Sequence, residues 1–99
     1  MRPVVEPTDA EPAIFAGVAR LGAAPNPFSV HTTISLAGAD ERRVPLTIVD
    51  VTGRTVKQLE IRSGRATWDG TDVAGRRLPS GVYFIRAPEA GAKRVLILR

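Results

Sequence analysis

Three aspartates are the side chains best suited to hold a metal ion. Asp69 and Asp72 lie three positions apart, and Asp50 lies in an earlier segment. Calcium takes roughly six to eight oxygen ligands, and the short run around Asp69 and Asp72 supplies too few. Aspartate also accepts hydrogen bonds from the backbone two residues further on, which makes it a turn former. We therefore expect Asp69 and Asp72 to close turns, and we assign the chain no metal ligand and no cofactor.

His31 is the only histidine, and the chain contains no cysteine. Serine-type catalysis would need this one imidazole beside an activated serine. None of the four serines, Ser29, Ser35, Ser63 and Ser80, lies in the Gly-x-Ser-x-Gly turn that exposes such a nucleophile. The lack of cysteine excludes disulfides, thiol nucleophiles and zinc–thiolate sites. We therefore expect no catalytic residue, no enzyme activity and no small-molecule substrate.

The chain carries a net charge of +4, and most of its arginines follow residue 24. Such a surplus can favour nucleic acid or an anionic surface. The few aromatic residues do not alternate with basic ones on a strand, so a face for stacking single-stranded nucleic acid is missing. No apolar run approaches the roughly 18 residues of a membrane-spanning helix. We expect neither nucleic-acid binding nor a membrane span.

Strands separated by turns must position these residues. Turn signals recur at the spacing typical of a sandwich, roughly every 8 to 12 residues. The pattern predicts strands over residues 31–37, 44–48, 54–61, 65–68, 82–87 and 92–98, with an uncertain seventh strand over 13–21. At 99 residues, the chain fits a single domain.

Alternation within these strands identifies the candidate core. Residues 32, 34 and 36 share one face of their strand. Pro45 indicates an edge position or a bulge, and the change of parity at Val49 predicts a bulge. Core candidates in the later strands are Val56, Leu59, Ile61 and Trp68. The fold class is therefore an all-β, immunoglobulin-like antiparallel sandwich of about seven strands.

The first 24 residues differ in composition from the rest. Residues 1–12 are proline-rich and acidic, which is typical of an extended tail or linker. Residues 13–21 are apolar enough to pair or pack. We divide the chain into an extended arm, residues 1–24, and a sandwich module, residues 25–99.

Five motifs in a fixed order resemble a known family. They are Pro25-Asn26-Pro27-Phe28, Thr32-Thr33-Ile34-Ser35-Leu36, the run from Ile48 to Arg54, the run from Trp68 to Phe84, and the final run from Lys93 to Arg99. This order resembles the type A carboxy-terminal sorting domain of the bacterial type IX secretion system. It is also similar to the immunoglobulin-like domain of flagellar hook-capping proteins. The resemblance covers about residues 25–99.

The resemblance implies a non-catalytic carboxy-terminal module of a secreted or cell-surface bacterial protein. Its partner would be the type IX secretion machinery, to which it directs a cargo protein before the module is removed or exchanged for a surface anchor. It implies structural roles for Trp68 and Asp69. The other residues that carry the family pattern are Pro25, Asn26, Pro27, Gly70, Gly75, Gly81, Tyr83, Lys93, Arg94 and Arg99. The three basic residues flank the last strand, where they are part of the signal, solubilising charges that blunt edge pairing, or both.

A second hypothesis belongs to a different class. Few residues precede the module, which leaves little room for a cargo. The chain would then be a structural subunit that assembles with copies of itself into a filament or tube. The arm would donate a strand to a neighbouring sheet edge through Ile14, Phe15, Val18 and Leu21. A plain adhesion or spacer domain is a third reading.

Overall fold

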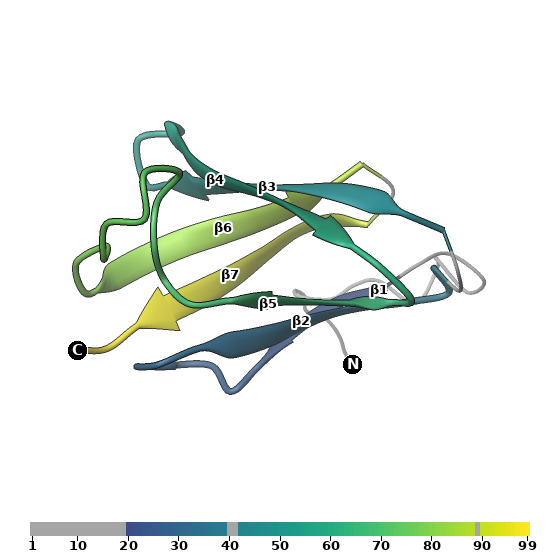
Figure 1. Cartoon of the computed structure of the whole chain (residues 1–99), viewed down its shortest axis with the longest axis horizontal. Coiled ribbons are helices and arrows are strands. Elements are labelled where there is room, and N and C mark those ends of the chain that lie inside the picture. Colours follow the sequence, from purple (N-terminus) through teal and green to yellow (C-terminus); the bar gives the residue numbers. More distant parts are fainter. Residues whose placement is uncertain (1–19, 40–41, 89) are drawn as a thin grey trace, which may run out of the picture.

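The computed structural model describes residues 20–39, 42–88 and 90–99. Within these residues, seven strands form two antiparallel sheets that face one another across one core, without a helix (Figure 1). The strands are β1 (Arg20–Ala24), β2 (Thr32–Ala37), β3 (Val44–Asp50), β4 (Thr55–Ile61), β5 (Arg65–Trp68), β6 (Gly81–Ala87) and β7 (Gly91–Ile97). The sheet orders are β1-β2-β5 and β4-β3-β6-β7. The expected all-β, immunoglobulin-like sandwich is confirmed.

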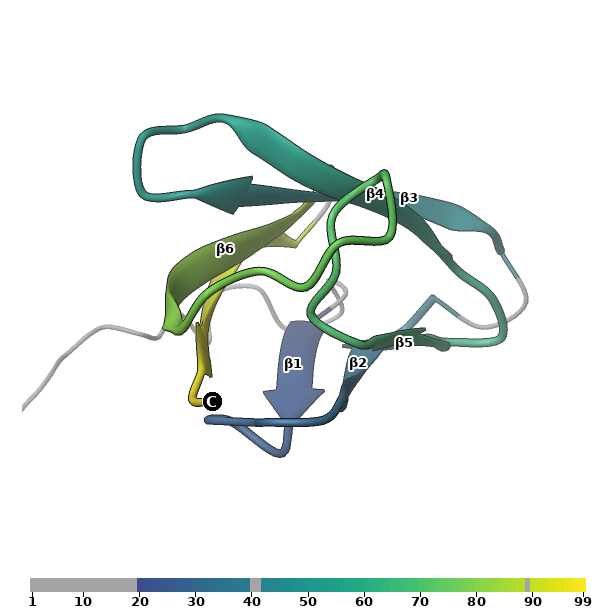
Figure 2. The same cartoon turned by 60° about the vertical axis from the view of Figure 1, so that its left-hand side comes forward.

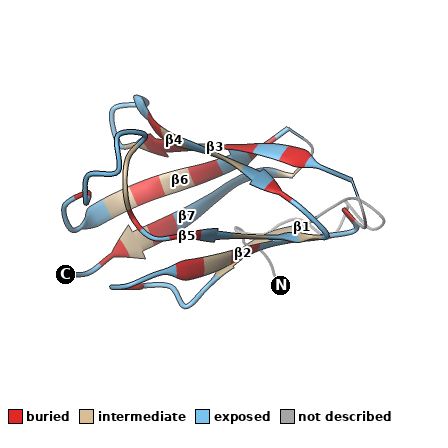
Figure 3. Cartoon of the chain, in the orientation of Figure 1, coloured by how far each residue is buried: buried red, intermediate tan, exposed pale blue. Residues whose placement is uncertain are grey.

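Alternating side chains of both sheets build the core. In β2 the predicted face of Thr32, Ile34 and Leu36 is buried, because every second residue of a strand points to the same side. Figure 3 shows buried residues along the strands of both sheets. Each such aliphatic side chain contributes roughly 1.5–3 kcal/mol by leaving water. The fully buried large side chains are Ile34, Leu36, Leu46, Ile48, Ile61, Trp68, Ile85, Val95 and Ile97.

The irregularity expected in the third strand lies on its neighbour. The register of β3 against β4 shifts between Ile48 and Val49, but the extra residue there is Val56 of β4, and β3 keeps its register with β6, so the prediction of a bulge in β3 is wrong. Pro45 lies in a central strand, but β6 pairs with β3 only from Thr47 onward. Pro45 therefore occupies a local edge, where its missing N–H costs no hydrogen bond.

One strand of the smaller sheet precedes the expected boundary at residue 25. Strand β1 pairs with β2 from Arg20, opposite Ala37, to Ala24, opposite Thr33. Small residues with weak strand propensity obscured this element, and pairing with β2 decides its conformation. The last two residues of the expected strand over 13–21 lie in β1, and residues 13–19 lie outside the described part.

Among the four residues expected to mediate self-association, Leu21 packs against the core of its own chain. The other three, Ile14, Phe15 and Val18, lie outside the described residues. The part of the chain that the structure describes contains no helix long and apolar enough to cross a membrane.

Candidate functional site

The loop between β1 and β2 is fastened to the last strand. The backbone N–H of Phe28 donates to the carbonyl of Leu96 at 3.0 Å, and the N–H of Leu98 donates to the carbonyl of Phe28 at 2.8 Å. Phe28 thereby forms a parallel bridge with Ile97. The carboxyl half of β7 consequently has hydrogen-bond partners on both sides.

Asn26 adds two bonds to the same junction. Its side-chain amide donates to the carbonyl of Arg94 at 3.0 Å, and its side-chain oxygen accepts from the N–H of Leu96 at 3.0 Å. The peptide bonds that precede Pro25 and Pro27 are both cis. The Pro25 carbonyl accepts from the hydroxyl of Thr32 at 2.8 Å. The three motif residues 25–27 thus lie in the loop that binds β7.

Trp68 is fully buried at the end of β5. Its ring centroid lies 5.4 Å from that of Phe28 and 5.7 Å from that of Tyr83, in tilted and edge-on arrangements that aromatic pairs favour. The indole N–H donates to the carbonyl of Thr71 at 3.0 Å, so its polar atom is satisfied. The expected core role of Trp68 is confirmed.

Tyr83 closes the same end of the sandwich from β6. Its ring is buried, and its hydroxyl donates to the carbonyl of Pro79 at 2.8 Å. A tyrosine near the start of this strand that bonds the backbone a few residues upstream is the tyrosine corner of immunoglobulin-like folds. Burial of the phenol raises the pKa of Tyr83, and the nearby carboxylate of Asp50 adds to the shift. The hydroxyl therefore stays a neutral donor in a structural bond.

Arg99 joins two loops, the β1–β2 loop and the β5–β6 connection, through its guanidinium. It donates to the carbonyls of Leu78 at 2.7 Å, Gly70 at 2.9 Å and Ser29 at 3.1 Å. Its backbone N–H donates to the hydroxyl of Ser80 at 2.8 Å. Its cation is thus engaged by carbonyls of its own chain.

Gly70 permits this arrangement for two reasons. Its φ of 77° lies in the left-handed region, which side chains with a Cβ adopt at a cost. A Cβ at this position would also lie 2.6 Å from Nη2 of Arg99. The glycine of the Trp68-Asp69-Gly70 motif therefore makes room for the last residue.

The aspartates act as turn formers. The carboxylate of Asp69 accepts from the N–H of Thr71 at 3.2 Å and from its hydroxyl at 2.6 Å. The hydroxyl bond is the main cause that lowers the pKa of Asp69. In the described part of the chain, no three histidine or acidic side chains gather into a group that could hold a metal ion.

A turn motif that occurs twice was not predicted from the sequence. The pattern Asp-Val-x-Gly-Arg occurs at residues 50–54 and again at 72–76. In both copies the carboxylate accepts from the N–H groups two and four residues on, and pairs with the arginine. These bonds lower the pKa of Asp50, mainly through the hydroxyl of Thr52, and that of Asp72, mainly through the N–H of Arg76.

The remaining motif residues separate into two groups. Gly81 opens β6 opposite Ile97. It lies at the end of the sandwich that Trp68, Tyr83 and Arg99 close, which we call the closed end. Lys93 and Arg94 lie exposed earlier on β7, and Gly75 lies in an exposed turn. The structure therefore brings most of the family pattern together around the end of β7, and it leaves two of the three basic residues free at the surface. Sequence reasoning missed Ser80, although the run Pro79-Ser80-Gly81 marked the turn that carries it.

Residues 27–93 match the FlgD Ig-like domain. The chain belongs to this family. The sandwich topology, the tyrosine corner and the loop bound to β7 are thus features of a FlgD Ig-like domain. No curated protein matches the chain.

Two solved structures from Porphyromonas gingivalis share this fold. One is PorZ, described as an essential bacterial surface component of the type-IX secretion system, with 26% identity and a TM-score of 0.63. The other is dimeric latent PorU, with 21% identity and a TM-score of 0.65, a likeness that shows the fold alone. The matches cover 80% and 81% of this chain, but only 11% of PorZ and 9% of PorU.

Proposed function

We propose that this FlgD Ig-like domain is a non-catalytic module of a secreted or cell-surface bacterial protein, and that it directs or anchors an attached cargo through the type IX secretion machinery. The observation that supports this most is the likeness to PorZ, a component of that system, over 80% of the chain at 26% identity. The side chains of the closed end support it too, because their polar atoms are engaged in turns and loop contacts rather than in chemistry.

On this proposal the machinery reads a folded surface. The end of β7 is bonded on both sides, and Arg99 binds three carbonyls of its own chain. Lys93 and Arg94 are then the basic residues of this strand that remain exposed to a partner.

Export of a reporter tests the proposal. The full chain is fused behind a secreted reporter in a bacterium that has the type IX system, and reporter at the surface is measured. Lys93→Gln with Arg94→Gln should lower surface reporter, while the charge-matched Arg62→Gln with Arg65→Gln should not. Failure of the unaltered chain to carry the reporter would reject the sorting function.

The alternative is a self-assembling subunit that donates a strand from the arm. The apolar residues Ile14, Phe15 and Val18 favour it, since they precede β1 in the sequence and would supply the side chains of a donated strand. Light scattering of the full chain and of Ile14→Asp with Phe15→Asp tests it. A full chain that stays monomeric at high concentration would reject assembly.

A further inference from the structure

The outer face of the four-stranded sheet is apolar for a surface. Every second residue of β6 faces the core, so Val82, Phe84 and Arg86 share the opposite face. Val82 lies opposite Leu96 of β7, and Phe84 lies opposite Val49 of β3. Val49 is only 2% exposed although it faces away from the core, and its two apolar neighbours on β6 are half-buried.

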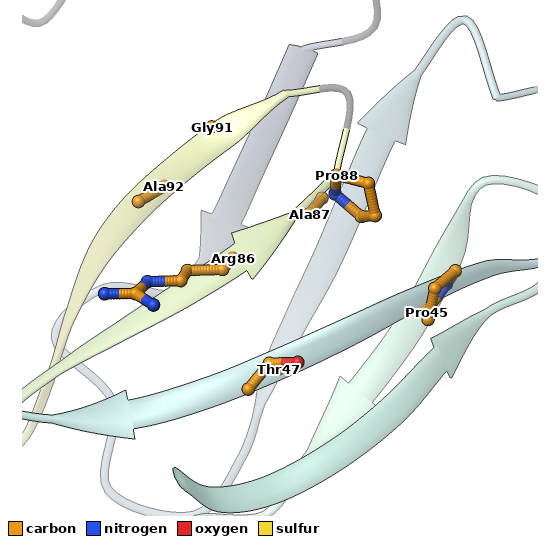
Figure 4. A pocket seen from close by; sticks show the side chains of 7 residues that line it. All are labelled: Pro45, Thr47, Arg86, Ala87, Pro88, Gly91 and Ala92. Carbon is orange, nitrogen blue, oxygen red and sulfur yellow. The ribbon is translucent and has the colours of Figure 1, made fainter. Parts of the chain in front are cut away.

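A groove continues this face toward the turn between β6 and β7. It has a volume of about 500 Å³. Figure 4 shows Pro45 and Thr47 from β3 on one side, and Arg86 and Pro88 on the other. The complete lining is Pro45, Thr47, Arg86, Ala87, Pro88, Gly91 and Ala92. Two prolines and one exposed cation therefore border an apolar depression.

The outer face of the three-stranded sheet has a different character. Its outward residues are small or polar, with Gly22 opposite Ser35, and Thr33 opposite Thr67. An antiparallel sheet with one solvated face normally carries such residues there. Half-buried apolar side chains thus gather on the outer face of one sheet, among the described residues, and apolar surface of this kind is typical of an interaction site.

The positive charge of the outer face favours an acidic partner, and the amino-terminal segment of the same chain is acidic. Arg86 and Arg94 are exposed on this face and form no ion pair with another described residue. Residues 1–19 contain one arginine against three acidic residues, a net −2, whereas residues 20–99 contain 13 basic against 7 acidic residues, a net +6. The same face of a second copy would instead oppose cation to cation.

The amino-terminal segment is joined to the sandwich at β1, which lies against the strand that lines the groove. Strand β1 lies against β7, and Gly91 and Ala92 at the start of β7 line the groove. Figure 4 shows β1 passing behind β7 beside the groove. Seven residues, 13–19, join residues 1–12 to β1, and a segment of this length can span at most roughly 23–25 Å.

We propose that residues 1–12 dock in cis on this outer face. The prolines of the segment pack beside Pro45 and Pro88, and its carboxylates, from Glu6, Asp9 and Glu11, pair with Arg86 and Arg94. Proline restricts the backbone of the unbound chain, so a proline-rich segment loses little conformational entropy when it binds. The docking can hold whether or not the module sorts a cargo, but the bound segment covers Arg94, so the machinery would reach that residue only after the segment is displaced.

A single spin label tests the proposal on the full chain. Because the chain has no cysteine, Thr8→Cys provides one attachment site for a nitroxide. Amide signals in the ¹⁵N-labelled protein broaden where the nitroxide approaches. We expect broadening of Phe84, Arg86 and Ala92, and none of Ser35 and Thr67 on the other outer face.

Charge variants and a mixed sample complete the design. The stronger broadening on the outer face of the four-stranded sheet should be lost when Glu6, Asp9 and Glu11 become Gln, Asn and Gln. It should also be lost when Arg86 and Arg94 become Gln. It should persist in the matched control Arg65→Gln with Arg77→Gln. Equal broadening of both outer faces would overturn the proposal. Broadening that is unchanged when Arg86 and Arg94 become Gln would overturn it too. In the mixed sample, a ¹⁵N-labelled chain without a nitroxide is combined with a spin-labelled chain at natural isotope abundance. If the amide signals broaden as strongly there as within one chain, a second copy's segment binds, and the proposal is overturned.

Discussion

The closed end of the sandwich and the outer face of its larger sheet both carry arginine from the carboxyl-terminal run, but they use it differently. Arg99 donates to three backbone carbonyls of its own chain. Arg94, five positions earlier, accepts a bond from the Asn26 amide through its backbone carbonyl, and its side chain stays exposed. Similar positions in a basic run therefore do not imply similar availability. The loops that reach the end of β7 decide which cation is left for a partner.

The largest expected contrast is between Trp68 and Phe84. Trp68→Ala should lower the free energy of unfolding by about 3–5 kcal/mol, because it empties the centre of the aromatic cluster. Phe84→Ala on the outer face should cost about 1 kcal/mol, because its ring is half-exposed. Urea unfolding of both variants measures the difference. Equal midpoints would contradict the assignment of the closed end as the centre of stability.

The two arginines give the next contrast. Arg99→Ala should lower the free energy of unfolding by about 1–3 kcal/mol, because three carbonyls lose a charged donor. Arg94→Ala should stay within about 0.5 kcal/mol. Arg99→Lys should recover only part of the loss, because an ammonium lacks the planar fork of a guanidinium. Thermal melts that rank Arg94→Ala below Arg99→Ala would reverse the comparison.

A comparison of two glycine variants tests the contact between Gly70 and Arg99. Gly75 has a φ of 84° with no atom within 4 Å of an added Cβ, so Gly75→Ala should cost about 1–2 kcal/mol for backbone strain alone. Gly70→Ala should cost more, because the Cβ would also displace Arg99. In an Arg99→Ala background, the cost of Gly70→Ala should fall to that of Gly75→Ala. A double-mutant cycle measures this coupling, and strict additivity would refute it.

Acid should produce the smallest effect. The lowered pKa of Asp50 and Asp72 means that their carboxylates stabilise the folded state at neutral pH, and that this contribution is lost as the pH falls through the lowered folded pKa, below about 4. Urea midpoints at neutral pH and near pH 3 measure it. Asp50→Asn with Asp72→Asn should reduce the pH-dependent drop, whereas the exposed control Glu60→Gln should leave most of it. An unchanged drop in the double variant would show that other carboxylates cause it.

Local patterns predicted the sandwich well. Alternation in β2 and the burial of Trp68 follow from side-chain periodicity and from residue size, both of which are visible in the sequence. The turn role of Asp69 follows from its chemistry. Strand β1 was harder to place, because Gly22 and its alanine neighbours have little strand preference and their pairing with β2 comes from the tertiary structure.

The candidate site was predictable as a set of residues but not as an arrangement. The sequence grouped Lys93, Arg94 and Arg99 by charge, whereas the three carbonyls that bind Arg99 come from loops distant along the chain. Such contacts leave no local signal. The repeated Asp-Val-x-Gly-Arg turn did leave one, since a comparison of residues 50–54 with 72–76 finds it directly.

The parallel bridge between Phe28 and β7 has a mechanical consequence. Strand β1 begins at the far end of the sandwich from the carboxyl terminus, and the chain leaves β7 at the near end (Figures 1 and 2). A force that pulls residues 20 and 99 apart therefore runs along the joined segments. It loads the bonds of Asn26 and Phe28 to β7 in shear, so that they must yield together instead of opening one after another.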